Sequence, residues 1–118
     1  LGDGSFSNRN SPVDVVGLSS GVLSINADRS LSTCATVSGN SVKCWGYNRE
    51  GGLGDGTTVN RSTATLVKGV SNAISVSAGG NYTCVVTSAG TASAPTPSWA
   101  SISATVAWAM QTVACAMI

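Results

Sequence analysis

Short runs of alternating apolar and polar residues, separated by turn residues, organise the first ninety positions of the chain. Ser38-Gly39-Asn40 lies between two such runs and has the composition of a tight turn between antiparallel strands. Gly in the Asp-Gly pairs at 3–4 and 55–56 allows the positive φ that a connecting turn needs. The pattern therefore predicts an all-β chain of short strands. The expected strands are Pro12–Val16, Val22–Ile25, Thr33–Val37, Ser41–Trp45, Ala64–Val67, Ile74–Ser77 and Thr83–Thr87.

The same pattern occurs twice, with a period near fifty residues. Leu1-Gly2-Asp3-Gly4 returns as Leu53-Gly54-Asp55-Gly56, 52 positions later. Further matches are Arg9 with Arg61, at the same offset, and Thr33-Cys34 with Thr83-Cys84, at an offset of 50. Four strands in a repeat of about fifty residues suit one blade of a β-propeller, and about four to eight blades close a ring. We therefore expect a partial β-propeller of four-stranded antiparallel blades, each leaving an apolar face for a neighbouring blade.

The amino-acid composition excludes several classes of function. The 118 residues are 42% hydrophobic, which suits one small folded domain. Only 9% of residues are charged and the net charge is +1, so the chain lacks the basic surface that nucleic-acid binding requires. It contains no His, which removes Ser-His and Cys-His catalysis and most metal sites. We expect no enzymatic activity, no cofactor and no metal.

One stretch of the sequence resembles the repeat of a known family. Cys44-Trp45-Gly46-Tyr47-Asn48, the run Gly51–Thr58 and then Arg61 resemble the repeat of the RCC1 (regulator of chromosome condensation) family, in a Cys-containing form similar to bacterial members. The resemblance covers Leu1 to about Gly90, or about one and three-quarter repeats, and implies blades of a seven-bladed β-propeller. We divide the chain into a first repeat at 1–52, a truncated second repeat at 53–90 and an atypical tail at 91–118. The structural residues of the motif are Trp45, Gly46, Asn48, Leu53, Gly54, Asp55 and Gly56.

The spacing of Cys34 and Cys44 suggests a disulfide rather than a metal site, because structural zinc ligands usually lie two to four residues apart. A three-residue turn at Ser38–Asn40 would place Cys34 opposite Cys44, within disulfide range. A two-residue turn would instead place Cys34 opposite Trp45, with the two thiols on opposite faces. Two buried reduced cysteines therefore remain the alternative. A disulfide would indicate an extracellular, cell-surface or periplasmic location.

The tail departs from the repeat. No Cys stands ten residues after Cys84, so the second half of that hairpin is expected to be missing. Residues 98–118 are uncharged and form a weak candidate for a membrane span, because polar residues interrupt them and no basic residue flanks them. Reading the codons of Trp99-Ala100 and Trp108-Ala109 two bases out of frame yields Gly at each junction. We hypothesise that a frameshift near Gly90 produced the tail.

These observations favour a non-enzymatic RCC1-like propeller fragment that acts as a scaffold for an unknown protein partner, next to neighbouring blades of a longer parent chain. Three alternatives remain open. Through its nuclear relative, the resemblance implies a guanine-nucleotide exchange factor for a small GTPase, although no residue here matches that role. The others are a secreted or surface recognition module and a decayed gene fragment without function.

Overall fold

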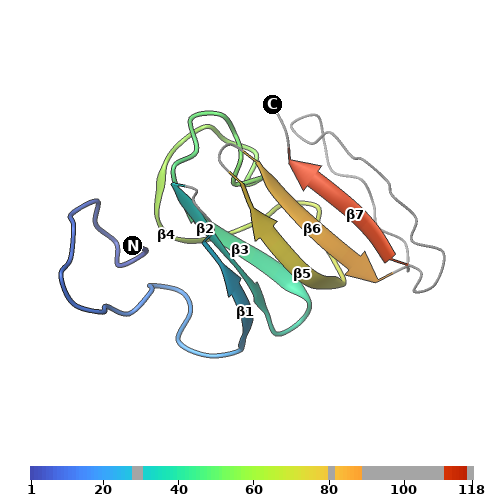
Figure 1. The fold of residues 1–118 in the computed structure, drawn as a ribbon, viewed down its shortest axis with the longest axis horizontal. Helices are drawn as coiled ribbons and strands as arrows, with labels where there is room; N and C mark the ends of the chain where they lie inside the picture. Colours follow the sequence, from blue (N-terminus) through green and yellow to red (C-terminus); the bar gives the residue numbers. More distant parts are fainter. Residues whose placement is uncertain (28–30, 80–81, 89–110, 117–118) are drawn as a thin grey trace.

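The computed structural model describes residues 1–27, 31–79, 82–88 and 111–116, and its strands form two antiparallel β-sheets (Figure 1). No helix occurs in these ranges, so the described chain is all-β, as the sequence predicts. Accordingly, no helix in the described ranges is long and apolar enough to cross a membrane. Most of the candidate span at 98–118, and most of the tail, lie outside the described residues.

Sheet A is the larger sheet and has four strands. They are β1 (Val22–Asn26), β2 (Ser32–Val37), β3 (Ser41–Gly46) and β4 (Arg61–Leu66), which lie in this order across the sheet. The turn between β2 and β3 contains three residues, and two of them, Gly39 and Asn40, have left-handed φ angles of 82° and 57°. Glycine and asparagine are the residues that adopt this conformation most readily. The turn pairs Val37 with Ser41, so the register is the one that the three-residue loop predicts.

Sheet B has three strands in the described residues. They are β5 (Ala73–Ala78), β6 (Thr83–Ser88) and β7 (Gln111–Ala116), in this order. The backbone of β7 is antiparallel to β6 and places Cys115 opposite Cys84. The expectation that Cys84 lacks the second half of its hairpin is therefore wrong. The strand opposite β6 comes from the end of the chain rather than from the residues that follow directly, which is why a fixed spacing of ten missed it.

The expected strand at Pro12–Val16 is also absent. Its counterpart in the second repeat, β4, has β3 beside it as a hydrogen-bonding partner. No strand lies within residues 1–21 to pair with this segment, and Pro12 has no backbone N–H to contribute to a ladder. The backbone of Val16 makes two isolated hydrogen bonds instead of a strand ladder. Its N–H donates to the carbonyl of Gly2 (2.8 Å), and its carbonyl accepts from the backbone N–H of Ala64 (3.2 Å).

The sheets are out of phase with the sequence repeat. Sheet A begins at Val22, in the repeat assigned to 1–52, and ends with β4, in the repeat assigned to 53–90. The turn motif Leu53-Gly54-Asp55-Gly56 therefore lies inside the connection between β3 and β4 and not between two sheets. The second sequence repeat thus supplies the last strand of sheet A and the first two strands of sheet B.

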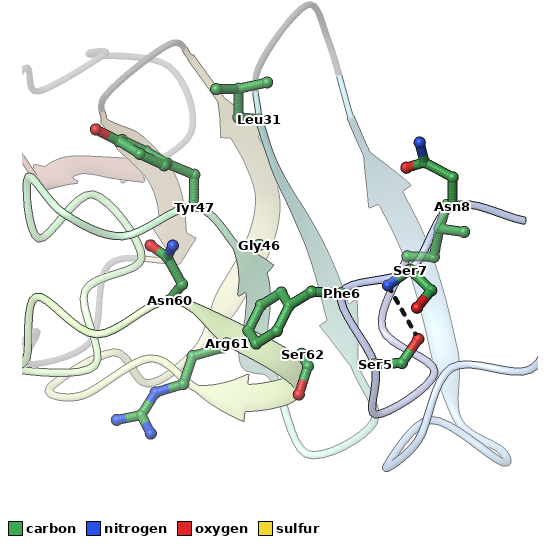
Figure 2. Close-up of a pocket in the computed structure, with 11 residues that line it drawn as sticks. Ser5, Phe6, Ser7, Asn8, Leu31, Gly46, Tyr47, Asn60, Arg61 and Ser62 are labelled. Atoms are coloured by element: carbon green, nitrogen blue, oxygen red, sulfur yellow. Dashed lines mark hydrogen bonds between the residues drawn. The ribbon is translucent and has the colours of Figure 1, made fainter.

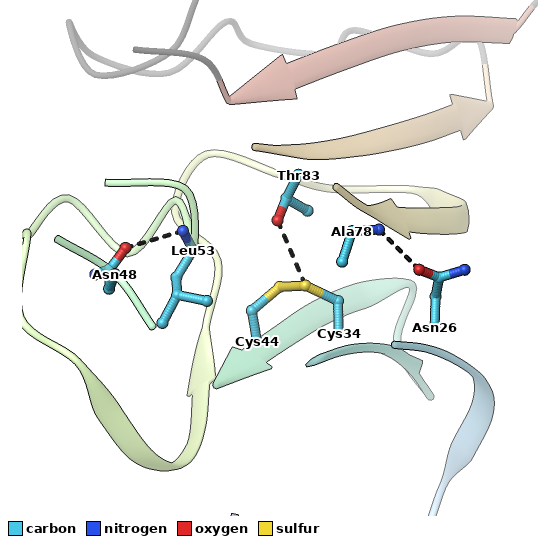
Figure 3. The surroundings of a disulfide bond; sticks show 7 residues. All are labelled: Asn26, Cys34, Cys44, Asn48, Leu53, Ala78 and Thr83. Atoms are coloured by element: carbon cyan, nitrogen blue, oxygen red, sulfur yellow. Dashed lines mark hydrogen bonds between the residues drawn. A yellow bond between two sulfur atoms is a disulfide. The ribbon is translucent and has the colours of Figure 1, made fainter. Parts of the chain in front are cut away.

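The hydrophobic core lies between the two sheets. Sheet A contributes Cys34, Val42 and Cys44, and sheet B contributes Ala73, Val76, Ala78 and Val85, with Leu53 and Val67 from the adjoining connections. Two polar contacts join the sheets at this interface (Figure 3). The side-chain oxygen of Asn26 accepts a 2.9 Å hydrogen bond from the backbone N–H of Ala78, and the Thr83 hydroxyl lies 3.5 Å from Sγ of Cys34.

Candidate functional site

The two cysteines of the β2–β3 hairpin lie opposite each other, and the structure places their sulfur atoms at disulfide distance (Figure 3). Their Cα atoms are 4.1 Å apart and both residues are fully buried. The register that would have put Cys34 opposite Trp45 is not the one found, because Trp45 pairs with Thr33. Both cysteines belong to the core between the sheets, so this pair serves packing and cross-linking and is shielded from solvent.

The connection between β3 and β4 is organised by the buried side chain of Asn48. Its amide nitrogen donates to the Asp55 carboxylate (3.1 Å) and to the carbonyls of Thr57 (3.0 Å) and Val59 (3.1 Å). Its amide oxygen accepts from the backbone N–H of Leu53 (2.9 Å). One side chain thus satisfies backbone groups that no strand partner reaches, which is the usual way in which a buried irregular segment is stabilised.

Asp55 and Arg61 close the same connection. Nε of Arg61 donates to Oδ2 of Asp55 (2.6 Å), and the other carboxylate oxygen accepts from the backbone N–H (2.9 Å) and the hydroxyl (2.8 Å) of Thr57. Burial alone would raise the pKa of Asp55. The hydrogen bonds from Thr57, Arg61 and Asn48 outweigh that effect and hold the pKa below its ordinary value. The carboxylate is therefore ionised and fully engaged at neutral pH.

The first repeat builds the same arrangement 52 residues earlier. Nε of Arg9 donates to Asp3 (2.7 Å), and the backbone N–H and hydroxyl of Ser5 donate to the same carboxylate (3.0 and 2.9 Å). These bonds, led by the one from Arg9, lower the pKa of Asp3 to about 2. The roles of the two hydroxyls were not predicted. Their signal in the sequence is a Ser or Thr two positions after each aspartate, four positions before the arginine.

The remaining residues of the predicted motif are either buried or glycines with a positive φ. Trp45 is buried, and the backbone of Gly2 approaches its indole so closely that a Cβ at Gly2 would lie 2.8 Å from Nε1. Leu53 is buried in the core between the sheets, whereas Trp45 lies outside that cluster. Gly46 has a φ of 110° and passes directly over the Leu31 carbonyl, where no Cβ fits. The two other predicted glycines, Gly54 and Gly56, have φ angles of 67° and 80°, which glycine adopts without strain.

A surface groove of about 370 Å³ lies between the N-terminal segment and the adjoining ends of β3 and β4 (Figure 2). Its lining combines apolar and aromatic side chains with hydroxyls and amides, from Leu1, Ser5, Phe6, Ser7, Asn8, Leu31, Gly46, Tyr47, Asn60, Arg61 and Ser62. Phe6 is 72% exposed on one wall, and Tyr47 lies on the other side. The guanidinium of Arg61 points away from the Phe6 ring, toward Asp55 and Thr57. Within the described residues, no group of three or more His, Cys, Asp or Glu side chains is placed to hold a metal ion.

Comparison with known families agrees with the strand pattern. The model of the regulator of chromosome condensation (RCC1) repeat matches residues 41–86. The match begins at the first residue of β3, covers the Asn48–Asp55–Arg61 connection and ends within β6. No curated protein matches the chain. Residues 41–86 are thus similar to an RCC1 repeat, and repeats of this kind form the blades of β-propellers.

Proposed function

We propose that this chain is a non-enzymatic binding module, an RCC1-type propeller fragment that presents its groove to a protein partner. The observation that carries the proposal is the exposed Phe6 ring across the groove from Tyr47, with Asn8, Asn60 and Ser62 also in the lining. Exposed aromatic side chains next to hydroxyls and amides are typical of protein-binding surfaces.

The chemistry of the groove supports binding rather than catalysis. Arg61, its charged lining residue, is held by the Asp55 carboxylate and the Thr57 hydroxyl, so it stabilises the turn. Acid–base catalysis requires a titratable group within hydrogen-bonding reach of a bound substrate, with a pKa near the working pH. Among the carboxylates in the described part of the chain, Asp3 and Asp55 have a shifted pKa, and each pKa is shifted downward, away from neutrality.

We further propose that the chain works in an oxidising compartment, at the cell surface, outside the cell or in a periplasm. The support is the Cys34–Cys44 pair, whose buried sulfur atoms lie at disulfide distance across a hairpin. Disulfides persist in such compartments and are rare in a reducing cytosol. Alkylation of the unreduced protein checks this: linked Cys34 and Cys44 support the location, and free thiols at both positions contradict it.

Affinity capture tests the binding function. We expect the wild-type chain to retain a specific protein from extracts of its source, and Phe6→Ser to lose most of that protein, because the exposed ring supplies apolar contact area at the groove. Val59→Ser is the matched control, since Val59 is 59% exposed but does not line the groove. Retention that is equal for all three chains, or no retained protein at all, contradicts the proposal.

A further inference from the structure

Two residues in equivalent positions of the two sheets have opposite exposures. Ile25 pairs with Ala35, one position before the Asn26–Cys34 pair, and Val76 pairs with Val85, one position before the Ser77–Cys84 pair. Ile25 therefore occupies in sheet A the position that Val76 occupies in sheet B. Val76 is 6% exposed, whereas Ile25 is 60% exposed.

The difference arises from what covers each residue. Val76 packs into the core against the face of sheet A that carries Cys34, Val42 and Cys44. Asn26 contacts Ala78 of sheet B, and side chains alternate along a strand, so Ile25 points to the opposite side, away from sheet B. Its neighbours on β1, Val22 and Leu23, are 43% and 63% exposed, so the strand carries three exposed apolar side chains.

The N-terminal segment covers another part of this side of sheet A. The Gly2 backbone lies against Trp45, and Nζ of Lys43, which lies across the sheet from Ile25, donates to the carbonyl of Gly17 (2.9 Å). Figure 1 shows this segment on the side of sheet A that faces away from sheet B. Exposed apolar side chains thus remain on β1, the strand that corresponds to β5, and at Leu66 of β4.

The outer side of sheet B repeats the surface that receives β5. Cys84 corresponds to Cys34 in register, and Val86, two positions further along β6, is half-buried on the same side. The exposed Ser77 corresponds to Asn26, which bonds to Ala78 in the contact between the sheets. Residues 69–118 contain no charged side chain, so no charge on that half of the chain opposes an apolar strand docking there.

We propose that a second copy of this chain docks β1 onto the outer side of sheet B, so that its Ile25 takes the place that Val76 has within one chain. Thr33 of one copy would then approach Cys84 of the other, as Thr83 approaches Cys34. The contact joins two different surfaces, so it is head-to-tail and continues into a ring or a filament. The proposal rests on the proposed binding-module function and names a second copy as one partner.

Sedimentation of the full chain over a range of concentrations tests this contact. The wild-type chain is expected to self-associate, and Ile25→Asp to weaken association at least tenfold, because the carboxylate would enter an apolar interface unpaired. Val59→Asp, which adds the same charge to another exposed valine, is expected to leave association unchanged. A monomeric wild-type chain, or equal weakening by both variants, overturns the proposal.

A mixing experiment keeps the test independent of the folding of any one variant. Ser77→Lys alters an exposed side chain on the outer side of sheet B, at the position that corresponds to Asn26 in the contact between the sheets. We expect each of Ile25→Asp and Ser77→Lys to associate weakly alone and the mixture of the two to regain association, because the unchanged Ile25 of the Ser77→Lys copy can dock onto the unchanged sheet B of the Ile25→Asp copy. A mixture no better than its parts contradicts the contact. A monomeric wild-type chain that still captures a protein through Phe6 overturns self-association alone and leaves the proposed function standing.

Discussion

The carboxylate of Asp55 and the guanidinium of Arg61 are joined by a 2.6 Å hydrogen bond that closes the connection between β3 and β4. The side chain of Asp55 is 2% exposed and that of Arg61 is 33% exposed, so this ion pair is largely shielded from water. The matching pair of the first repeat, Asp3 and Arg9, is more open, at 8% and 44%. The same motif therefore supports a buried turn in one repeat and a surface turn in the other.

This difference predicts unequal effects of removing the two aspartates. Asp55→Ala should lower the free energy of unfolding by about 2–3 kcal/mol, since it removes charge-assisted hydrogen bonds and leaves the buried Asn48 amide with one acceptor fewer. Asp3→Ala should cost clearly less, because water can replace its contacts. Urea denaturation of both variants measures this. A larger loss from Asp3→Ala would contradict our view of which turn supports the fold.

Acid should weaken the protein through the same two carboxylates. The folded state lowers both pKa values, that of Asp3 from 3.8 to about 2. Between these values the unfolded chain binds more protons than the folded one, so stability is fully present above about pH 4 and is lost as the pH falls toward 2. Thermal unfolding from pH 7 to 2 should show this decline, and Asp55→Asn should make it shallower. An unchanged slope in that variant would refute the assignment.

Gly46 should be far less replaceable than Gly39, although both have positive φ angles of 110° and 82°. A Cβ at Gly46 would collide with the Leu31 carbonyl and lie 2.9 Å from Cα of Ser32, whereas nothing lies within 4 Å of a Cβ at Gly39. Gly46→Ala should therefore cost about 3 kcal/mol, from backbone strain and overpacking together. Gly39→Ala should cost about 1 kcal/mol, from backbone conformation alone. Equal losses in denaturant titrations would show that the contact with Leu31 is unimportant.

Removing the cross-link between β2 and β3 should destabilise the core. The two cysteines are separated by 10 positions, and a disulfide closing so short a loop contributes about 2–3 kcal/mol. We expect the double variant Cys34→Ala, Cys44→Ala to lose about that much relative to the oxidised wild type. A variant as stable as the oxidised protein would mean that the bond contributes nothing.

The sequence predicts the local structure well because each strand is short and ends at turn residues. The strands around Cys34 and Cys44 and their register follow from one three-residue turn, because the register of a hairpin is fixed by its loop. The paired aspartates follow from the repeat, since identical residues at one offset adopt identical turns. These are contacts between residues close in sequence, and the local order of residues determines them.

The same reasoning could not predict which strands pair when they lie far apart in the sequence. Whether Pro12–Val16 becomes a strand depends on a partner strand, and within residues 1–21 none is formed. The backbone of β7 completes sheet B from a distance of more than twenty residues, which no hairpin spacing indicates. The groove was not predicted for the same reason, because it joins Phe6 to Tyr47 and Asn60 across two sequence repeats.

Proton–proton contacts measured by NMR test most directly whether the two sheets share one core. We predict nuclear Overhauser effects between the Asn26 side chain and the Ala78 amide proton, and between Cys34 and Thr83, since these pairs meet only where sheet A contacts sheet B. A folded, well-dispersed spectrum with both contacts present would support two packed blades. The same spectrum with neither contact would contradict the account.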